Sequence, residues 1–308
     1  MISEKRGKVI KGLGGLFEVR IFDTGEVIAC RAKGTLKRDE DKVYVGDEVT
    51  VTLDDTTPDG VVISRIEARR SVLIRPPVAN LDYLFIVFAA AKPAPVIETV
   101  DKLISICEYN SILPIVVITK CDVGAAEEYE AIYRLAGIPT FVTSSESGEG
   151  TGALSEFVRE NITRGKTAAF AGASGVGKST LMNSLFPSLA LKTADISRKI
   201  ERGRHTTRHV ELFALTDRGD TGFLADTPGF SLLDFARFDF FSLEELFSTF
   251  REFAGYVGKC RYADCSHTGE GAEECALAKA AEEGEIAPSR LESYRSIYKI
   301  LKEKKDYK

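Results

Sequence analysis

The chain has 308 residues, of which 44% are hydrophobic and 28% charged, and its formal net charge is −5. These values are typical of a globular protein of two or three domains, and they exclude a disordered or strongly basic chain. The longest apolar run, residues 83–91, is too short to cross a bilayer, and the N-terminus carries no apolar signal region. We therefore expect a cytoplasmic protein without membrane contact, in which any RNA contact comes from local patches.

Residues 1–72 are predicted to form a small β-domain. They hold five short alternating apolar runs, separated by turns rich in Gly and Asp. Such a pattern favours a closed barrel, with the OB-fold as the expected form, and barrels of this kind often bind RNA. A local group of basic residues comprises Arg31, Lys33, Lys37 and Arg38. The group could meet phosphates, but an ordinary solvated loop explains it equally well because acidic residues 39–41 follow.

Residues 73–235 are predicted to form an α/β domain after a linker at Arg75-Pro76-Pro77. A buried strand is expected over 81–90, an amphipathic helix over 97–109 and a strand over 115–118. Strands that alternate with helices imply a parallel sheet.

A candidate guanine-reading motif, Thr119-Lys120-Cys121-Asp122, ends the third of these segments. The Asp122 carboxylate can accept hydrogen bonds from guanine N1 and N2, whereas adenine offers no such pair of donors. Lys120 would lie along the face of the base, and Cys121 occupies the variable position. Alone, the motif is weak, because a charged turn at a strand end explains it about as well.

A second short apolar run, residues 139–142, is followed by Thr143-Ser144-Ser145. Hydroxyl and amide groups there could support the base from behind. This signal is weak by itself and gains weight only from its neighbours.

The strongest motif is a phosphate-binding loop, G-x-x-x-x-G-K-S, which follows an apolar run and precedes a helical segment. Its backbone N–H groups would close around the β-phosphate, Lys178 would neutralise the β and γ oxygens, and Ser179 would bind Mg²⁺. The expected phosphate site comprises Gly172, Ala173, Ser174, Gly175, Val176, Gly177, Lys178, Ser179 and Thr180.

Two further segments, switch I (residues 203–208) and switch II (residues 226–229), are expected to sense the γ-phosphate. In Asp226-Thr227-Pro228-Gly229, the Asp226 carboxylate can hold Mg²⁺ through water, and the Gly229 N–H can meet the γ-phosphate. Upstream, Gly203-Arg204-His205-Thr206-Thr207-Arg208 offers a threonine that completes the Mg²⁺ shell only when the γ-phosphate is present. Thr206 and Thr207 compete for this role; we choose Thr207, because in similar GTPases the ligand directly precedes the basic residue.

His205 is the candidate catalytic residue, beside Lys178 and Thr207. Many GTPases place Gln after the switch II glycine to orient the attacking water, but this chain has Phe230 there. We hypothesise that His205 orients the attacking water when a partner orders residues 203–208. The alternative is that His205 only packs or contacts RNA.

These motifs resemble those of a translation-factor-class GTPase in permuted order, because the guanine motif precedes the phosphate loop. Permutation is tolerated when the ends of a compact domain lie at its surface. One consequence is that the chain leaves the GTPase core directly after switch II. Whatever follows is therefore attached to a segment that senses the γ-phosphate.

Residues 236–308 are predicted to form a mainly helical domain that binds zinc. Three cysteines and a histidine recur at short spacing: Cys260, Cys265, His267 and Cys275. Three thiolates and an imidazole complete a closed tetrahedral Zn²⁺ site. The alternatives are buried free cysteines or a disulfide, the latter disfavoured without a secretory signal. A capping box at 242–245 starts a helical pattern that runs to 250, and a second such pattern spans 291–301.

Taken together, the motifs resemble the RsgA/YjeQ family of circularly permuted GTPases that depend on the small ribosomal subunit. The resemblance covers nearly the whole chain, including Arg75-Pro76 and Val78-Ala79-Asn80. It implies GTP hydrolysis to GDP with Mg²⁺, one structural Zn²⁺, and binding to the 30S subunit and its 16S rRNA late in assembly, where the protein would release other maturation factors. It is also compatible with binding of guanosine tetraphosphate, and we expect a monomer.

Two positions depart from the family pattern. Thr119 stands where GTPases commonly have Asn, which would weaken a contact to guanine N7. The spacing between His267 and Cys275 is two residues longer than the usual one, so Glu270, Glu273 or Glu274 stay open as alternative ligands to Cys275. An ATPase, or an RNA-binding scaffold with vestigial nucleotide binding, are the competing functions.

Overall fold

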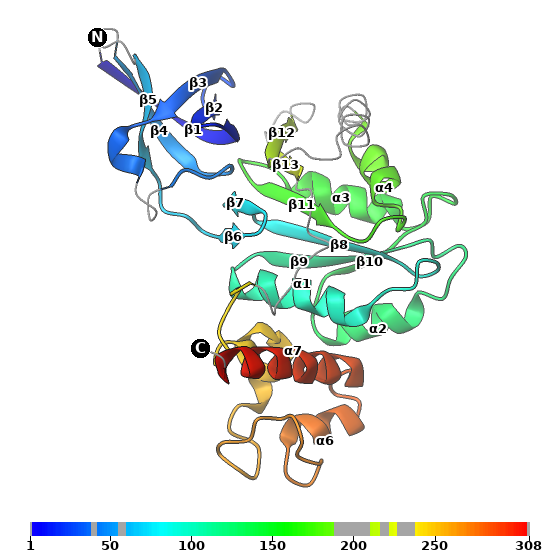
Figure 1. Cartoon of the computed structure of the whole chain (residues 1–308). Coiled ribbons are helices and arrows are strands. Elements are labelled where there is room, and N and C mark those ends of the chain that lie inside the picture. The colour runs from blue at the N-terminus through cyan, green and yellow to red at the C-terminus, as the bar shows by residue number, and fades with distance from the viewer. Residues whose placement is uncertain are drawn as a thin grey trace. The chain divides into compact units, whose positions relative to one another are not determined.

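The computed structural model describes residues 2–37, 42–54, 60–187, 210–215, 222–226 and 238–306 (Figure 1). The chain divides into two compact units, which we describe separately. The first unit holds residues 1–83, 157–170 and 182–230, and the second holds 84–156, 171–181 and 231–308. These units cut across the expected division into 1–72, 73–235 and 236–308, which stays a prediction.

A five-stranded barrel forms the N-terminal part of the first unit. Its strands are β1 (Ile2–Leu13), β2 (Leu16–Ile21), β3 (Val27–Ala32), β4 (Glu48–Asp54) and β5 (Val61–Ile66), with a 3₁₀ turn η1 (Gly34–Lys37) after β3. β1 pairs with both β2 and β4, β2 pairs with β3, and β5 pairs with β3 and β4, so the ring closes. The predicted barrel is thereby confirmed.

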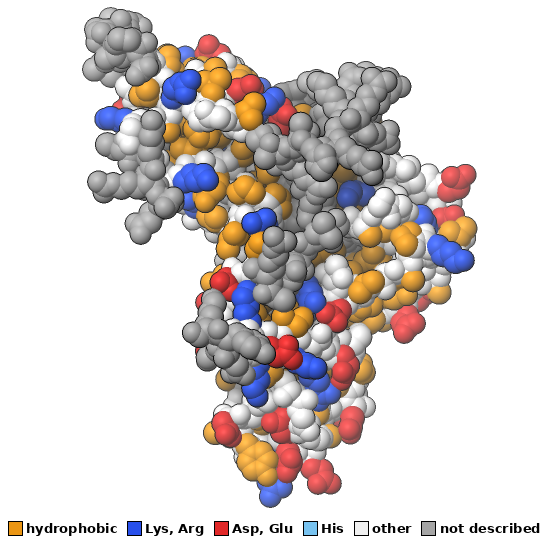
Figure 2. All heavy atoms as spheres, in the orientation of Figure 1, with side chains coloured by type: hydrophobic (Ala, Val, Ile, Leu, Met, Phe, Trp, Pro, Cys, Tyr) orange, Lys and Arg blue, Asp and Glu red, His pale blue; other side chains and the backbone are white. Residues whose placement is uncertain are grey.

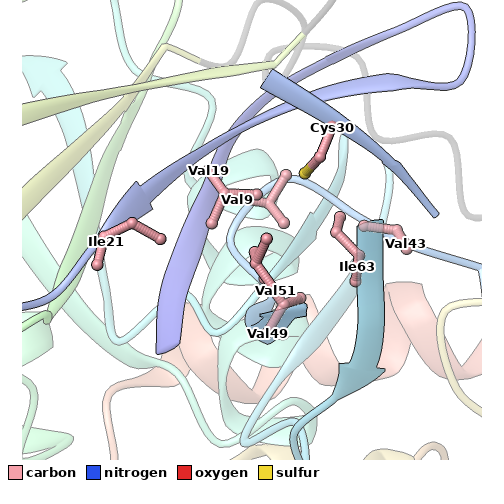
Figure 3. Packing of buried hydrophobic residues seen from close by; sticks show 8 residues of the cluster. All are labelled: Val9, Val19, Ile21, Cys30, Val43, Val49, Val51 and Ile63. Carbon is pink, nitrogen blue, oxygen red and sulfur yellow. The ribbon is translucent and has the colours of Figure 1, made fainter. Parts of the chain in front are cut away.

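The barrel is filled by β-branched side chains that alternate along the strands with exposed ones. Val9, Val51 and Ile63 have no exposed surface, and they meet Cys30 in one cluster (Figure 3). β-Branched residues suit a pleated surface buried on one side. The turn between β1 and β2 needs two left-handed residues, which Gly14 and Gly15 supply with φ of 58° and 80°.

The predicted linker is more ordered than a simple connection. It holds a small antiparallel pair, β6 (Val72–Ile74) and β7 (Pro77–Ala79), joined through a cis Arg75–Pro76 peptide bond. Val78 also forms a bridge to Val45 of the barrel. The prolines therefore shape a turn between two short strands.

Three α/β strands belong to the first unit: β11 (Thr167–Ala171), β12 (Glu211–Leu215) and β13 (Gly222–Asp226). β11 and β13 are parallel, and β13 and β12 form an antiparallel pair. The outer edge of β12 pairs with β1 at Lys11 and Glu211. The barrel and the β12–β13 pair are thus joined by sheet hydrogen bonding.

The second unit contains the other three strands, β8 (Tyr83–Ala89), β9 (Leu113–Thr119) and β10 (Thr140–Val142). β10 and β9 are parallel, as the alternation of strands and helices predicted. The helices of the α/β region are α1 (Ile97–Tyr109), α2 (Glu127–Leu135), α3 (Thr151–Asn161) and α4 (Lys178–Leu185). α1 has the bounds that its amphipathic pattern predicted.

The C-terminal module, residues 238–306, packs against α1 within the second unit. Its elements are η4 (Leu246–Thr249), η5 (Arg251–Tyr256), α6 (Ala276–Glu282) and α7 (Pro288–Asp306). The helical pattern over 243–250 predicted an α-helix, but the structure has 3₁₀ turns there. Phe250 adopts an extended conformation and stacks its buried ring on Phe253 at 4.9 Å, which interrupts a regular helix. The capping contact still forms, since the Ser242 N–H donates to Glu245.

On the face drawn in Figure 2, acidic and basic side chains are interspersed over the C-terminal module. This mixture agrees with the modest net charge of −5. None of the helices within the described parts of the chain has the length and apolar character needed to span a bilayer.

Candidate nucleotide site and metal cluster

The guanine motif and the phosphate loop meet at the end of β9. Thr119, the last residue of β9, is 3% exposed, and its Oγ1 lies 2.5 Å from the Val176 carbonyl oxygen and 3.2 Å from that of Phe88. The hydroxyl is thus turned toward the phosphate loop. A threonine at the position of the usual asparagine fastens the guanine motif to the loop through its short side chain.

Lys120 makes a second connection to the same loop. Its backbone is left-handed, with φ of 59°, and its Nζ donates to the carbonyl oxygens of Gly175 at 2.8 Å and Lys92 at 2.7 Å. The aliphatic stem of Lys120 is thereby held in one direction. Asp122, two residues on, is exposed and presents its carboxylate to solvent.

The phosphate loop has a conformation that depends on its glycines. Gly175 and Gly177 are left-handed, with φ of 80° and 91°. A Cβ on Gly172 would collide with the Val87 carbonyl oxygen, so a side chain there would displace β8. α4 begins at Lys178, whose Nζ lies within the loop, 3.1 Å from the Gly172 carbonyl oxygen.

Residues 143–145 lie beside the guanine motif, as their sequence position suggested. The Cys121 N–H donates to the Thr143 carbonyl, and the Thr143 N–H donates to that of Ile118. The buried Ser144 hydroxyl accepts the N–H groups of Glu146 and Ser147, which closes a tight turn. Ser145 is exposed.

Cys121 is the half-exposed thiol within this motif. Burial, together with the nearby carboxylate of Glu149, raises the pKa of its thiol above the usual range. The thiol is therefore protonated at neutral pH, and Cys121 serves as the variable residue between Lys120 and Asp122.

The structure also identifies a contact that the sequence analysis missed. The loop after β8 supplies the Lys92 carbonyl that holds Lys120, and the Pro93 ring lies 3.9 Å from where a Gly175 Cβ would be. A proline-rich run directly after a buried strand, Lys92-Pro93-Ala94-Pro95, was the available signal.

The γ-phosphate segments are mostly outside the described residues. This applies to Gly203–Arg208, with His205, Thr206 and Thr207, and to residues 227–230, with Gly229 and Phe230. Asp226 ends β13, so its backbone position is described but its side chain is not. Their roles stay predictions.

The predicted metal ligands come together in the C-terminal module. The ligand atoms of Cys260, Cys265, His267 and Cys275 all lie within 4.8 Å of one another. The His267 Nδ1 is 3.4 Å from each of the three sulfur atoms. Zn–S bonds of about 2.3 Å and Zn–N bonds of about 2.0 Å place tetrahedral ligands roughly 3.5 Å apart, so the donor set fits this ion.

Cys275 belongs to this cluster, and among the described residues no glutamate joins it. The residue is fully buried directly before α6, and the Ala276 N–H donates to the Cys260 sulfur at 3.3 Å. The longer spacing from His267 is taken up by the turn that precedes Cys275.

A hydrogen bond and a ring contact fix the position of His267, the predicted histidine ligand. His267 is left-handed, with φ of 62°, and its carbonyl oxygen accepts a hydrogen bond from the Arg295 Nε at 3.0 Å. Its ring packs against Phe247, with the centroids 5.3 Å apart. Burial lowers the pKa of His267, although Glu270 opposes that shift, so the imidazole is neutral and able to bind a metal at neutral pH.

Comparisons with known proteins identify the family of the chain. The chain matches the RsgA N-terminal domain over residues 6–62 and the RsgA GTPase over residues 66–236. It is 40% identical to the small ribosomal subunit biogenesis GTPase RsgA of Bacillus velezensis, covering 97% of this chain and 98% of the relative. It is 39% identical to RsgA 2 of Listeria monocytogenes over 97% and 98% of the two chains.

Solved structures are similar along almost the whole chain. YjeQ from Thermotoga maritima has a TM-score of 0.75 at 31% identity, covering 97% of this chain and 99% of that one. YloQ, described as a circularly permuted GTPase, has a TM-score of 0.74 at 31% identity, covering 99% and 96%. With the guanine motif ahead of the phosphate loop and both joined as described, the chain belongs to the RsgA GTPase family and is a GTP hydrolase.

Proposed function

We propose that this GTPase acts on the 30S ribosomal subunit late in its assembly. The relatives carry small-subunit biogenesis in their names. The structural observation that carries the nucleotide part of the proposal is the attachment of the guanine motif to the phosphate loop by Thr119 and Lys120, which unites base reading with phosphate binding. Such a site selects GTP over ATP.

The bound nucleotide would be read at its base and at its phosphates. Asp122 would accept hydrogen bonds from guanine N1 and N2 while Lys120 covers the ring. The backbone of residues 173–179 would close around the phosphates, and Lys178 would turn its charge from the Gly172 carbonyl to them. Ser179, Thr207 and Asp226 would hold Mg²⁺, which neutralises the charge that develops on the phosphate oxygens.

Hydrolysis breaks the bond between the γ-phosphorus and the β–γ bridging oxygen as water attacks the γ-phosphorus, and it yields GDP and phosphate. Because Phe230 cannot orient water, we assign that role to His205, which would act when the protein is bound to the 30S subunit. Replacement of His205 by Ala should lower subunit-stimulated turnover roughly 100-fold while leaving nucleotide affinity unchanged. Unchanged turnover would mean that His205 packs or contacts RNA instead.

The two flanking regions would provide the grip on the subunit. Both the barrel and the C-terminal module would contact 16S rRNA, and hydrolysis would weaken this grip and release assembly factors. We place this activity in the cytoplasm, with the protein as a monomer, and expect guanosine tetraphosphate to compete for the same site. Equal affinity for the subunit with GDP and with a non-hydrolysable GTP analogue would contradict nucleotide-controlled release.

Zinc is the metal that we propose for the Cys₃His cluster. Its four ligands leave no open coordination position, so the ion would be structural. Metal analysis of the purified protein should return one zinc per chain. A protein that folds fully and contains no zinc would contradict the assignment.

The deciding experiment measures phosphate release from GTP, alone and with purified 30S subunits, using ATP and naked RNA as controls. We expect large stimulation by the subunit and little by naked RNA or with ATP. Absence of stimulation would leave a GTP site whose partner lies elsewhere, and equal turnover of ATP would identify an ATPase.

Guanine recognition has its own test. Asp122→Ala should weaken GTP binding about 100-fold, because two hydrogen bonds to a carboxylate are lost. Glu128→Ala, an exposed carboxylate on α2, is the matched control and should bind GTP normally. Equal binding of GTP by both variants would refute the role of Asp122.

A further inference from the structure

Lys8 is a buried cation that the nucleotide chemistry does not use. It lies on β1 in the barrel wall, opposite Arg20 of β2 and Glu48 of β4, and its side chain has no exposed surface. A lysine is seldom buried without a specific reason, because removing its charge from water is costly. Its contacts therefore indicate what it holds.

The ammonium group of Lys8 reaches out of the barrel to the start of β11. Its Nζ donates to the Gly165 carbonyl oxygen at 2.5 Å and to the Thr167 Oγ1 at 3.1 Å. Thr167 is fully buried and is the first residue of β11. Both acceptors are neutral, so these contacts fix a position more than they balance a charge.

The same ammonium group also touches β13. It lies 5.1 Å from the centroid of the Phe223 ring, and Phe223 is paired with Thr167 across the two parallel strands. A cation over an aromatic face is attracted by it, more strongly when water is excluded. Lys8 thus contacts the first residue of β11 and the second residue of β13 at once.

These two strands lead directly to the nucleotide chemistry. β11 ends at Ala171, next to Gly172 of the phosphate loop, and β13 ends at Asp226. Thr167 lies four residues, or about 13 Å, before the end of β11, and Phe223 lies three residues, or about 10 Å, before the end of β13, so a shift at either contact has a short path to the nucleotide chemistry. Figure 1 shows β11 and β13 side by side, as their pairing requires.

Charged neighbours surround Lys8 from several elements. Glu48 lies 3.9 Å away, and Asp82, Arg70 and Lys166 act on it from farther off. Asp82 is itself tied to β11, because its carboxylate accepts the Thr167 N–H and the Lys166 ammonium, each at 2.8 Å. The joint between the barrel and β11 is therefore built from several polar contacts around one buried cation.

We propose that Lys8 is a positioning residue for GTP hydrolysis, which sets the phosphate loop and Asp226 according to how the barrel is held on its partner. The proposal rests on the proposed function, because the partner that holds the barrel is the 30S subunit. Lys8 contacts Thr167 of β11 and Phe223 of β13, and it would act through these two strands.

The test compares Lys8→Met with Lys5→Met. Lys5 lies on the same strand, but its half-exposed side chain pairs with Glu26 at 3.3 Å. With saturating 30S subunits, Lys8→Met should lower the kcat for GTP about tenfold and leave the KM for the subunit within about twofold, since misplaced catalytic groups slow the chemical step. Lys5→Met should change neither. A loss confined to the KM, or no loss, would overturn the proposal.

A second variant guards against misfolding of the first. Thr167→Val keeps the shape of the residue and removes one acceptor of Lys8. It should lower the same kcat about threefold, and the double variant should be no slower than Lys8→Met, because coupled residues act through one contact. Fully additive losses would show that the two residues act independently and would contradict the proposal.

Hydrogen exchange of the free protein separates this proposal from the function on which it rests. Lys8→Met should raise amide exchange in residues 165–169 and 222–225 about tenfold, while Lys5→Met should not. Unchanged exchange would overturn the role of Lys8 whether or not the subunit stimulates turnover. If wild-type protein is not stimulated, the proposed function fails, and this exchange measurement still decides whether Lys8 holds the strands.

Discussion

The barrel and the C-terminal module are each held by one buried cation, and the two cations are neutralised differently. Arg290 of α7 has 0% exposure and pairs with Asp101 of α1 and Glu252 of η5, at 2.7 Å each. Lys8 of the barrel is equally buried, but its closest carboxylate, Glu48, lies 3.9 Å away. One joint is a double ion pair, whereas the direct hydrogen-bond acceptors of Lys8 in the other joint are both neutral.

This difference appears in the proton affinities of the two side chains. Burial lowers the pKa of Lys8 to about 8, because Glu48 and Asp82 offset only part of the desolvation. Burial also acts to lower the pKa of Arg290, but Asp101 and Glu252 outweigh it and raise that pKa. The module is therefore joined to α1 by a permanently charged contact. The contact between the barrel and β11 can lose its charge within an accessible pH range, because Lys8 can release its proton.

The comparison also bears on which region responds to the nucleotide. The chain order attaches the C-terminal module to the end of switch II. The Arg290 pairs, and the Arg251 pair with Glu108, nevertheless fix the module on α1 within the second unit. In the first unit, the barrel pairs with β12, which follows the switch I segment in sequence. We therefore expect the barrel to respond more readily than the module.

The largest expected effect is loss of the zinc ion that we propose for the Cys₃His cluster. Apparent binding energies of structural zinc are about 10–16 kcal/mol, and the fold of a small module depends on them. Cys275→Ser, or treatment with a strong chelator, should remove hydrogen-exchange protection from α6 and the start of α7 and leave the barrel protected. Cys121→Ser, which removes a thiol outside the cluster, is the matched control and should keep both metal and protection. Full protection of α6 without metal would contradict the prediction.

Removal of Arg290 should be the next largest effect. Arg290→Met leaves the buried carboxylates of Asp101 and Glu252 without the arginine that balances their charge, which costs about 3–5 kcal/mol. Urea unfolding followed by exchange of α7 should report this loss. Arg134→Met removes an exposed pair with Glu130 and should cost less than about 1 kcal/mol. Similar losses in both variants would mean that the buried network does not hold the module.

The sequence predicted elements whose pattern is local. The barrel strands follow from alternation of residues such as Val9, Val19 and Val51 with polar ones, and α1 follows from its apolar stripe. The phosphate loop, the guanine motif and the four metal ligands were readable because their chemistry requires fixed residue types at short spacing. Even so, the pattern over 243–250 predicts an α-helix that the structure replaces by 3₁₀ turns, because the stacking of Phe250 on Phe253 is a tertiary contact.

The contacts between distant segments could not be predicted. Arg290 and Asp101 are 189 positions apart, and Lys8 and Thr167 are 159 apart. In the sequence, Lys8 is a charged residue at the start of a predicted strand, where exposure is the ordinary expectation. Only the fold brings a neutral carbonyl and a hydroxyl to its side chain.

Lys8→Met should behave unlike Arg290→Met. At pH 7 the substitution removes a desolvated charge and leaves two acceptors unpaired, so the opposing effects should keep the change in unfolding free energy within about 1 kcal/mol. A loss above about 3 kcal/mol at pH 7 would show that Lys8 is stabilised as strongly as Arg290.

The pH dependence of the unfolding free energy of Lys8→Met, relative to wild type, gives the sign of the contribution of Lys8 to stability. The pKa of Lys8 is about 8 in the folded protein, whereas an unperturbed lysine has a pKa of 10.5. Between these values the unfolded chain binds the extra proton, so the stability of wild type relative to Lys8→Met should rise with pH, by at most about 3 kcal/mol. Below about pH 7 the difference should be constant, because Lys8 is then protonated in both the folded and the unfolded chain. Urea unfolding of both proteins from pH 7 to 10.5 measures it, and a decline over this range would contradict the assigned shift.

The smallest effect concerns the exposed pair that accompanies the barrel joint. Lys11 and Glu211 pair at 3.3 Å between β1 and β12, with side-chain exposures of 40% and 37%. An exposed pair contributes less than about 1 kcal/mol and is screened by salt. Lys11→Glu should therefore raise amide exchange in β12 only a few-fold at low salt, and adding Glu211→Lys should restore it.

The Lys5–Glu26 pair provides a control of equal geometry, also at 3.3 Å but remote from β12. Reversing the charge of Lys5 should leave amide exchange in β12 unchanged. Comparison of the two pairs therefore separates the effect of location from the effect of charge. If Lys11→Glu opened β12 by a hundredfold or more, an effect that large could not come from an exposed pair. The joint would then depend on the edge pairing of β1 with β12 more than on Lys8.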